Sequence, residues 1–154
     1  MGWSDGGITG IDLALHHPER VNHLVAFGAN FRPDGLIERE VAWDDTATVA
    51  AFGEEGRRAY EALAPDPSHY AQAMQRILTL WRTQPEFSPE DLHRIRARVL
   101  IAAGERDVVR REHTEQLAAA IPGARLWIVP GATHRAIFEQ PDLVERVVLD
   151  FLEQ

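Results

Sequence analysis

The chain opens with Gly2-Trp3-Ser4-Asp5-Gly6, which has the spacing Gly-x-Ser-x-Gly. This spacing predicts a sharp turn from a strand into a helix, with the serine hydroxyl exposed on a strained backbone. The glycine on either side is expected to leave room where a side chain would clash. Ser4 is therefore a candidate nucleophile, and the alternative interpretation is a polar residue in a frayed terminus.

Two apolar runs later in the chain each end in glycine and lead to a polar residue with catalytic chemistry. Val99-Leu100-Ile101-Ala102-Ala103-Gly104 leads to Asp107, and Leu126-Trp127-Ile128-Val129-Pro130-Gly131 leads to His134. An acid after one buried strand and a histidine after the next complete the chain order Ser, Asp, His. We therefore predict that the acid and the histidine form a catalytic triad with Ser4.

The composition is that of an ordinary globular domain. The 154 residues are enough for one domain with a sizeable core, and the absence of cysteine excludes disulfides and thiolate metal sites. No apolar run approaches the roughly 20 residues of a membrane span, and no secretion signal is predicted. The net charge of -8 disfavours nucleic acid or an anionic membrane as a partner. We expect a cytoplasmic protein without a metal or a cofactor.

Hydrophobic periodicity and turn residues divide the chain into helices and strands. Helices are predicted at residues 8–16, 46–52, 54–63, 70–81, 112–120 and 141–152, and strands at 21–27, 99–103 and 126–129. Pro122-Gly123 and Pro130-Gly131 are expected to mark turns. The helix that follows Ser4 would point its N-terminal amides back toward this serine.

Strands that alternate with helices predict an α/β fold with a parallel sheet of about three strands and flanking helices. Residues 31–94 are more charged, contain helical stretches and lie between two predicted buried strands. We expect this insertion to form a helical cap over a core made of residues 1–30 and 95–154.

With these three site residues in place, the sequence resembles the C-terminal part of a serine α/β-hydrolase, starting at the nucleophile elbow. The segment Gly2-Trp3-Ser4-Asp5-Gly6-Gly7-Ile8-Thr9 is most similar to the valacyclovir hydrolase (biphenyl hydrolase-like) branch, and so is Phe27-Gly28-Ala29-Asn30. Gly104-Glu105-x-Asp107 and Gly131-x-x-His134 are similar to many α/β-hydrolases. Because the nucleophile position holds serine and not aspartate, the resemblance favours ester, thioester or amide hydrolysis over epoxide or haloalkane chemistry.

The resemblance also implies a role for each site residue. His134 would take the proton of the Ser4 hydroxyl, and Asp107 would orient the imidazole and stabilise its protonated form. The backbone N–H of Asp5 would contribute to the oxyanion hole. In this branch the aspartate after the nucleophile binds the α-amino group of the substrate, whereas the alternative role of Asp5 is to complement the helix N-terminus.

Other aromatic and charged residues have two interpretations. Trp3, together with Trp43 and Trp81, is a candidate to line a substrate pocket under the cap, and ordinary packing is the alternative. His16-His17 suggests a metal site, but a position at the C-terminus of a helix explains the pair better. We expect no metal site and no cofactor.

The sequence departs from complete members of the family in what precedes the elbow. The resemblance implies further strands before Ser4 and an earlier loop with a second oxyanion donor, for which the sequence shows no counterpart. We expect a truncated α/β-hydrolase fold, which is a fragment, a misassigned start or a natural truncation. The edge of the strand at 21–27 would then be bare and apolar, and we expect homo-oligomerisation or an exchange of elements through it.

Two functions remain open at this point. The first is a serine hydrolase that acts on small-molecule carboxylic esters, with α-amino acid esters or amides as candidate substrates. The second is a catalytically inactive hydrolase fragment that acts as an oligomerising or interaction module. A comparison of the chain with its Ser4→Ala variant would separate the two.

Overall fold

The sheet has one strand more than expected. The computed structural model describes residues 1–37 and 53–154, and in these residues four parallel strands run in the order β1-β2-β3-β4. The strands are β1 (Gly2–Trp3), β2 (His23–Phe27), β3 (Arg98–Arg106) and β4 (Arg125–Thr133). The unexpected strand is β1, which pairs with Ala26 and Phe27. A strand of two residues is too short to leave a hydrophobic pattern, so the prediction of about three strands missed it.

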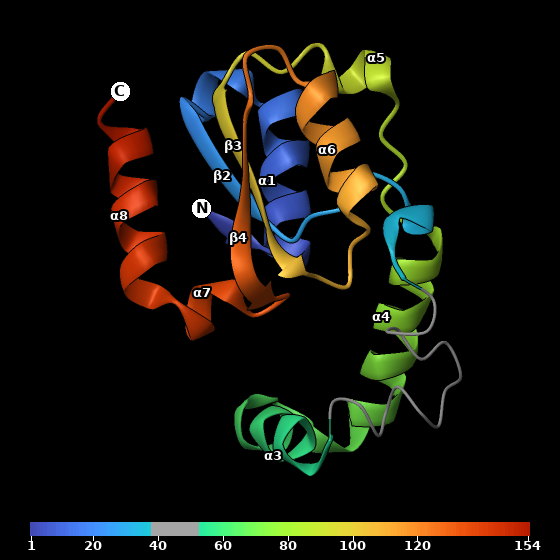
Figure 1. The fold of residues 1–154 in the computed structure, drawn as a ribbon. Helices are drawn as coiled ribbons and strands as arrows, with labels where there is room; N and C mark the ends of the chain where they lie inside the picture. Colours follow the sequence, from blue (N-terminus) through green and yellow to red (C-terminus); the bar gives the residue numbers. More distant parts are fainter. Residues whose placement is uncertain (38–52) are drawn as a thin grey trace.

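Helices cover both faces of this sheet (Figure 1). α1 (Asp5–His16) and α6 (Arg111–Ala120) lie on one face, and α8 (Pro141–Leu152) lies on the other, after the short helix α7 (Ala136–Glu139). Among the described residues between β2 and β3 are three further helices, α3 (Gly53–Leu63), α4 (Tyr70–Thr83) and α5 (Pro89–Leu92). This layered arrangement is the α/β fold that the alternating strands and helices predicted.

Alternating side chains on the central strands build two separate cores. On β2, Leu24 and Ala26 belong to the core beneath α1 and α6, whereas Val25 and Phe27 belong to the core beneath α8. All four residues are at most 4% exposed. Because successive side chains of a strand point to opposite faces, a continuous apolar run fills both cores at once.

Most predicted helices are present with small shifts at their ends. The helices predicted at 54–63, 70–81, 112–120 and 141–152 correspond to α3, α4, α6 and α8. The helix predicted at 8–16 begins three residues earlier, at Asp5, because the Ser4 carbonyl accepts hydrogen bonds from the N–H groups of Gly7 and Ile8. The helix predicted at 46–52 lies outside the described residues. The division into a core and a cap stays a prediction.

β4 continues through Pro130-Gly131, where a turn was predicted. The strand runs to Thr133, and its register with β3 shifts between Gly104 and Arg106. A proline lacks the N–H that a ladder needs, but β4 is an edge strand of the sheet, and there a proline is tolerated. The prediction of a turn that ends the strand was therefore wrong, although Gly131, with a φ of +69°, departs from extended backbone, and the strand ends directly before His134.

β1 covers part of the sheet edge that was expected to be bare. Its two residues pair with Ala26 and Phe27 of β2. The preceding part of β2, His23 to Val25, pairs with β3 on one side and with no described strand on the other. The expectation of a bare edge is thus wrong for the end of β2 next to the elbow and correct for its beginning.

Candidate active site

Ser4 lies on a strained turn between β1 and α1. Its φ of 54° and ψ of -124° are rare for residues with a side chain, and among the described residues no other non-glycine residue has a positive φ. Such a backbone costs on the order of 1–3 kcal/mol and persists only where the surrounding structure holds it. Here the Ser4 N–H donates to the Phe27 carbonyl at 2.8 Å, which fixes the turn to β2.

The two glycines of the Gly-x-Ser-x-Gly motif differ in their surroundings. A Cβ on Gly2 would lie 2.1 Å from the carbonyl oxygen of Gly6, so the turn excludes a side chain at this position. A Cβ on Gly6 would meet no atom within 4 Å. The expectation that both glycines relieve a clash is correct for Gly2 and wrong for Gly6, because Gly6 faces open space at the start of α1.

The first turn of α1 presents two backbone donors next to Ser4. The N–H groups of Gly7 and Ile8 bond to the Ser4 carbonyl, whereas those of Asp5 and Gly6 donate to none of the described residues. Free N–H groups at the N-terminus of a helix, together with the helix dipole, attract negative charge. An oxyanion that forms at a substrate bound to Ser4 would find these donors available.

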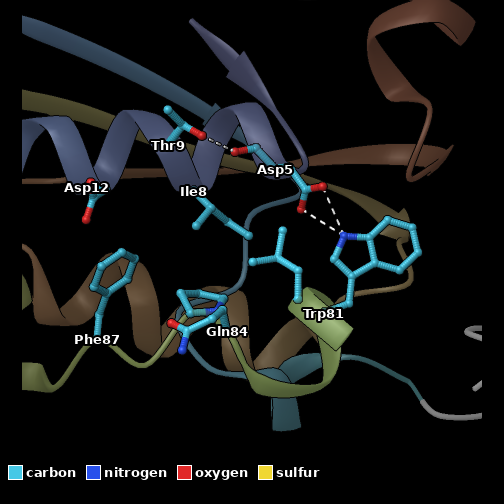
Figure 2. A pocket seen from close by; sticks show the side chains of 9 residues that line it. Asp5, Ile8, Thr9, Asp12, Trp81, Gln84 and Phe87 are labelled. Atoms are coloured by element: carbon cyan, nitrogen blue, oxygen red, sulfur yellow. Dashed lines mark hydrogen bonds between the residues drawn. The ribbon is translucent and has the colours of Figure 1, made fainter. Parts of the chain in front are cut away.

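The Asp5 side chain lines a pocket of about 280 Å³ between α1 and the end of α4 (Figure 2). Trp81 on α4 donates its indole N–H to both carboxylate oxygens of Asp5, at 3.1 and 3.0 Å. The apolar walls of the pocket include Ile8, Leu80, Pro85 and Phe87. Within the described part of the chain, Asp5 has no ion-pair partner. The pocket therefore combines these apolar walls with polar side chains, which include a second carboxylate, Asp12, and no cation pairs with Asp5 among the described residues.

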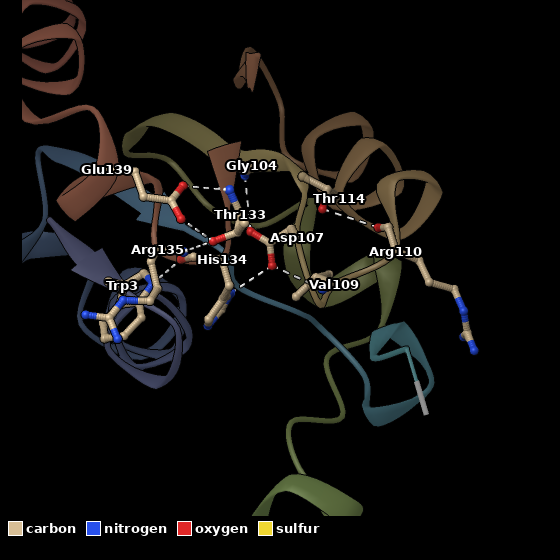
Figure 3. Close-up of polar contacts among 10 residues, drawn as sticks. All are labelled: Trp3, Gly104, Asp107, Val109, Arg110, Thr114, Thr133, His134, Arg135 and Glu139. Atoms are coloured by element: carbon tan, nitrogen blue, oxygen red, sulfur yellow. Dashed lines mark hydrogen bonds and ion pairs between the residues drawn. The ribbon is translucent and has the colours of Figure 1, made fainter. Parts of the chain in front are cut away.

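Asp107 lies directly after β3 and accepts three hydrogen bonds (Figure 3). Oδ2 accepts the N–H of Gly104 at 3.1 Å, and Oδ1 accepts the N–H of Val109 at 3.1 Å. The third partner is Nδ1 of His134, which lies 2.7 Å from Oδ1. The Asp107 side chain is only 2% exposed. An ionised carboxylate accepts hydrogen bonds and donates none, so these partners hold it in one orientation.

His134 directly follows β4, and its ring has a defined tautomer. Because an ionised carboxylate only accepts hydrogen bonds, the contact with Asp107 favours the neutral tautomer of His134 with the proton on Nδ1, which leaves Nε2 as the acceptor. Gly28 leaves room for the ring, since a Cβ at this position would lie 2.7 Å from Nδ1. Its φ of +56° also favours glycine. A base oriented in this way can take a proton through Nε2.

Trp3 connects the elbow to the loop that carries the histidine. Its indole N–H donates to the His134 carbonyl at 2.7 Å, and the centres of the two rings are 5.3 Å apart. The Trp3 ring also meets Phe138 of α7 edge-on, with 5.3 Å between the ring centres. Trp3 was predicted to bind substrate, and this role stays a prediction, because its contacts are to the histidine loop and to α7. Trp43, the third predicted pocket residue, lies outside the described residues.

The three predicted triad residues follow the carboxyl ends of β1, β3 and β4. His134 and Asp107 are joined directly, and Trp3, the neighbour of Ser4, contacts His134. The Ser4 hydroxyl makes no hydrogen bond with the described residues, the His134 ring included. Hydrogen bonds between nucleophile and base are often long before a substrate binds and tighten in the complex.

Residues 1–37 and 53–154 contain neither a candidate metal site nor a candidate membrane-spanning helix. No group of three or more histidine and carboxylate side chains is arranged to hold a metal ion. No helix there is both long enough and apolar enough to pass through a lipid bilayer.

The family of the chain follows from a match to a known protein family. Residues 1–147 match the model of the alpha/beta hydrolase family. The chain belongs to the alpha/beta hydrolase family. This family places a nucleophile, an acid and a histidine in the chain order of Ser4, Asp107 and His134. The resemblance that the sequence motifs indicated is thereby confirmed.

Several curated relatives in this alpha/beta hydrolase family are similar over nearly the whole chain. The human protein named serine hydrolase BPHL is 28% identical over 160 residues, which are 99% of this chain and 54% of the human protein. A putative carbamate hydrolase RutD from a Caulobacter species is 29% identical over 171 residues, 99% of this chain and 64% of that protein. The chain therefore spans about half of the length of the human relative, and the motif-based similarity to the biphenyl hydrolase-like branch is confirmed.

Solved structures of several hydrolases have the same fold as this chain. The meta-cleavage product hydrolase CumD from Pseudomonas fluorescens superposes with a TM-score of 0.77 at 24% identity, over 99% of this chain and 63% of that chain. A serine hydrolase of carbazole degradation, CarC, superposes with a TM-score of 0.71 at 22% identity, over 99% of this chain and 62% of that chain. These likenesses establish the fold, and the chain spans less than two thirds of the length of either of these structures.

Proposed function

We propose that this chain carries the site of a serine hydrolase, in which Ser4 is the nucleophile, His134 the general base and Asp107 the residue that orients the base. The hydrogen bond of 2.7 Å between His134 and the buried Asp107 carries the proposal, together with the strained elbow at Ser4, whose neighbour Trp3 contacts His134. The serine hydrolase BPHL among the relatives supports the same reaction class.

The reaction begins when Ser4 Oγ attacks the carbonyl carbon of an ester while His134 Nε2 takes the hydroxyl proton. The tetrahedral intermediate collapses to an acyl-serine, and the leaving alkoxide receives the proton from Nε2. A water molecule then attacks the acyl group, gives its proton to Nε2 and releases the acid, and Ser4 recovers its proton. Asp107 stays ionised throughout and stabilises the imidazolium that forms in each half of the cycle.

Asp5 has two parts in the proposed site. Its backbone N–H, unbonded within the described residues, stabilises the oxyanion, and the loss of one such donor typically costs roughly 100- to 1,000-fold in rate. Its carboxylate, which has no ion-pair partner in the described part of the chain, binds the α-amino group of an amino acid ester. Trp3 flanks the site through its contact with His134.

We further propose that two copies of the chain associate through the edge formed by β1 and the beginning of β2. The backbone groups of this edge from His23 to Val25 lack a described partner strand, and an unpaired edge is a template for another chain.

The test compares purified chain 1–154 with its Ser4→Ala and Asp5→Ala variants. The substrates are p-nitrophenyl acetate and aminoacyl esters. We expect Ser4→Ala to abolish hydrolysis of both, and Asp5→Ala to remove the preference for aminoacyl esters. Equal rates for the chain and for Ser4→Ala would contradict the catalytic proposal and would leave the non-catalytic interaction module as the function.

A further inference from the structure

The contact between Asp5 and Trp81 joins the first turn of α1 to the last turns of α4. The two residues are 76 positions apart in the chain, and one indole N–H reaches both carboxylate oxygens at nearly equal distances, 3.1 and 3.0 Å. Figure 2 shows the indole of Trp81 facing the carboxylate across the mouth of the pocket. The carboxylate that follows the nucleophile is thus held by a residue from the segment between β2 and β3.

The chemistry of this donor leaves the carboxylate able to bind a cation. An indole N–H is neutral, so it orients the Asp5 carboxylate and leaves its negative charge in place. An arginine at this position would instead neutralise that charge. A carboxylate has about four lone-pair sites, and a single shared N–H leaves acceptor capacity on both oxygens for the three N–H donors of an ammonium group. The contact therefore prepares the carboxylate and does not block it.

Orientation is the contribution that Asp5 cannot supply by itself. The terminal torsion of an aspartate side chain is broad, so an exposed carboxylate without a partner samples many directions. A group that must be ordered when the ligand arrives weakens binding, whereas a group that is already ordered does not. The nearly symmetric contact with Trp81 orients both oxygens at a pocket whose walls combine apolar side chains with the polar Thr9, Asp12 and Gln84.

We propose that Trp81 is a positioning residue for substrate amines: its indole N–H holds the Asp5 carboxylate in the direction that binds the α-ammonium group. This inference rests on the amine-binding role proposed for Asp5. It assigns to α4 a share in substrate selection, because loss of the indole N–H frees the carboxylate while the charge of Asp5 remains.

The kinetic test uses two esters that differ only in the amino group, the p-nitrophenyl esters of phenylalanine and of 3-phenylpropanoic acid. The Trp81→Phe variant keeps an aromatic ring and removes the N–H. We expect its KM for the amino ester to rise about threefold to tenfold with little change in kcat, which is the signature of lost binding that is equal in ground and transition states. The preference for the amino ester over the neutral ester falls by the same factor.

Trp127→Phe is the matched control, because it removes an indole N–H from β4, where the ring packs against Phe27 with 5.8 Å between the ring centres. We expect this variant to keep the wild-type ratio of kcat/KM between the two esters. If Trp81→Phe instead lowers kcat for both esters in parallel, Trp81 has only a structural role and the proposal is overturned.

A second measurement needs no catalysis. In the Ser4→Ala background, the indole N–H signals of the tryptophans are followed by heteronuclear NMR, and the signal of Trp81 is assigned by its loss in Trp81→Phe. We expect L-phenylalaninamide to shift this signal, 3-phenylpropanamide to leave it in place, and Asp5→Asn to abolish the response. A Trp81 signal that stays constant with both amides, or that moves equally with both, overturns the proposal even if the hydrolase activity is real. A shift with L-phenylalaninamide but not with 3-phenylpropanamide, in a chain that hydrolyses nothing, supports the amine subsite and contradicts only the catalytic function.

Discussion

At the scale of single residues, Asp107 shows why a carboxylate is needed at its position. Its two oxygens accept hydrogen bonds from Gly104, Val109 and His134, and its side chain is almost fully buried. An asparagine of the same shape would place an NH₂ group against one of these donors. If its amide nitrogen faced His134, the imidazole would have to accept at Nδ1 and carry its proton on Nε2. Nε2 could then not act as the base.

We therefore predict that Asp107→Asn lowers kcat by about 10,000-fold, as the wrong tautomer does in serine hydrolases, with little change in the fold. The measurement is kcat for p-nitrophenyl acetate, with the thermal midpoint of unfolding as the control for folding. A loss of less than about tenfold, which is roughly 1.4 kcal/mol, would mean that His134 does not depend on Asp107 for its orientation.

Residues at the ends of strands could be predicted from the sequence, whereas contacts between distant helices could not. Ser4, Asp107 and His134 each follow a strand, and the carboxyl ends of parallel strands meet at one edge of the sheet. The bond from Trp81 to Asp5 has no local signal, because it depends on how α4 is placed against α1. Tryptophan in a helix is ordinarily a packing residue, and its polar partner becomes evident only in three dimensions.

At the scale of elements, the segment after β2 is attached to the loop that carries Asp107. Leu36 forms an antiparallel bridge with Val109, and the N–H of Ile37 donates to the Val108 carbonyl at 2.8 Å. The N–H of Arg110 donates in return to the Gly35 carbonyl at 2.8 Å. The segment that follows β2 is thereby hydrogen-bonded to the residues directly after Asp107.

His113 of α6 reinforces this attachment as a neutral, buried side chain. Its Nε2 accepts the N–H of Phe31 at 3.1 Å, and the two rings stack with 4.0 Å between their centres. Burial lowers the pKa of His113 from 6.5 to about 4, against the opposing effect of the Asp34 carboxylate and with a smaller contribution from Arg32 and Arg110. A proton on Nε2 would remove the acceptor and place two donors face to face.

This arrangement predicts a specific loss of stability in acid. Because the pKa of His113 is lower in the folded chain than in the unfolded chain, its contribution is complete above pH 6.5 and is lost as the pH falls toward about 4. The free energy of unfolding should fall over this interval by at most about 3 kcal/mol more in the wild type than in His113→Gln. Denaturant unfolding of both proteins at several pH values measures the difference, and parallel pH dependences would contradict the role of His113.

Elements with strong periodicity could be predicted, and those whose limits depend on pairing could not. α8 has the predicted ends, because proline at its first position and an amphipathic repeat define it locally. β1 exists only because Gly2 and Trp3 pair with β2, and β4 extends past Pro130 only because its register with β3 shifts. Such pairings are long-range, so the local sequence at these positions indicates a turn or no structure.

At the scale of the whole molecule, the two edges of the sheet differ in what lies beside them. β4 forms one edge over nine residues, and β1 forms the other over only two. Phe138, which is 57% exposed, packs on Trp3 near the short edge, and Leu126, which is 42% exposed, lies on the long edge. Each edge therefore carries an exposed apolar side chain that can report on association.

We predict that the chain forms a dimer through the β1 side and that Phe138→Ser weakens it, whereas Leu126→Ser leaves it intact. The reason is that β2 from His23 to Val25 has no partner among the described strands on that side, and a strand of a second copy would pair with it. Light scattering coupled to gel filtration at a series of concentrations gives the mass of each variant. A wild-type chain that remains monomeric at micromolar concentration would contradict this prediction. If Leu126→Ser rather than Phe138→Ser shifted the mass, association would occur through β4, because that edge offers the longer ladder to a second copy.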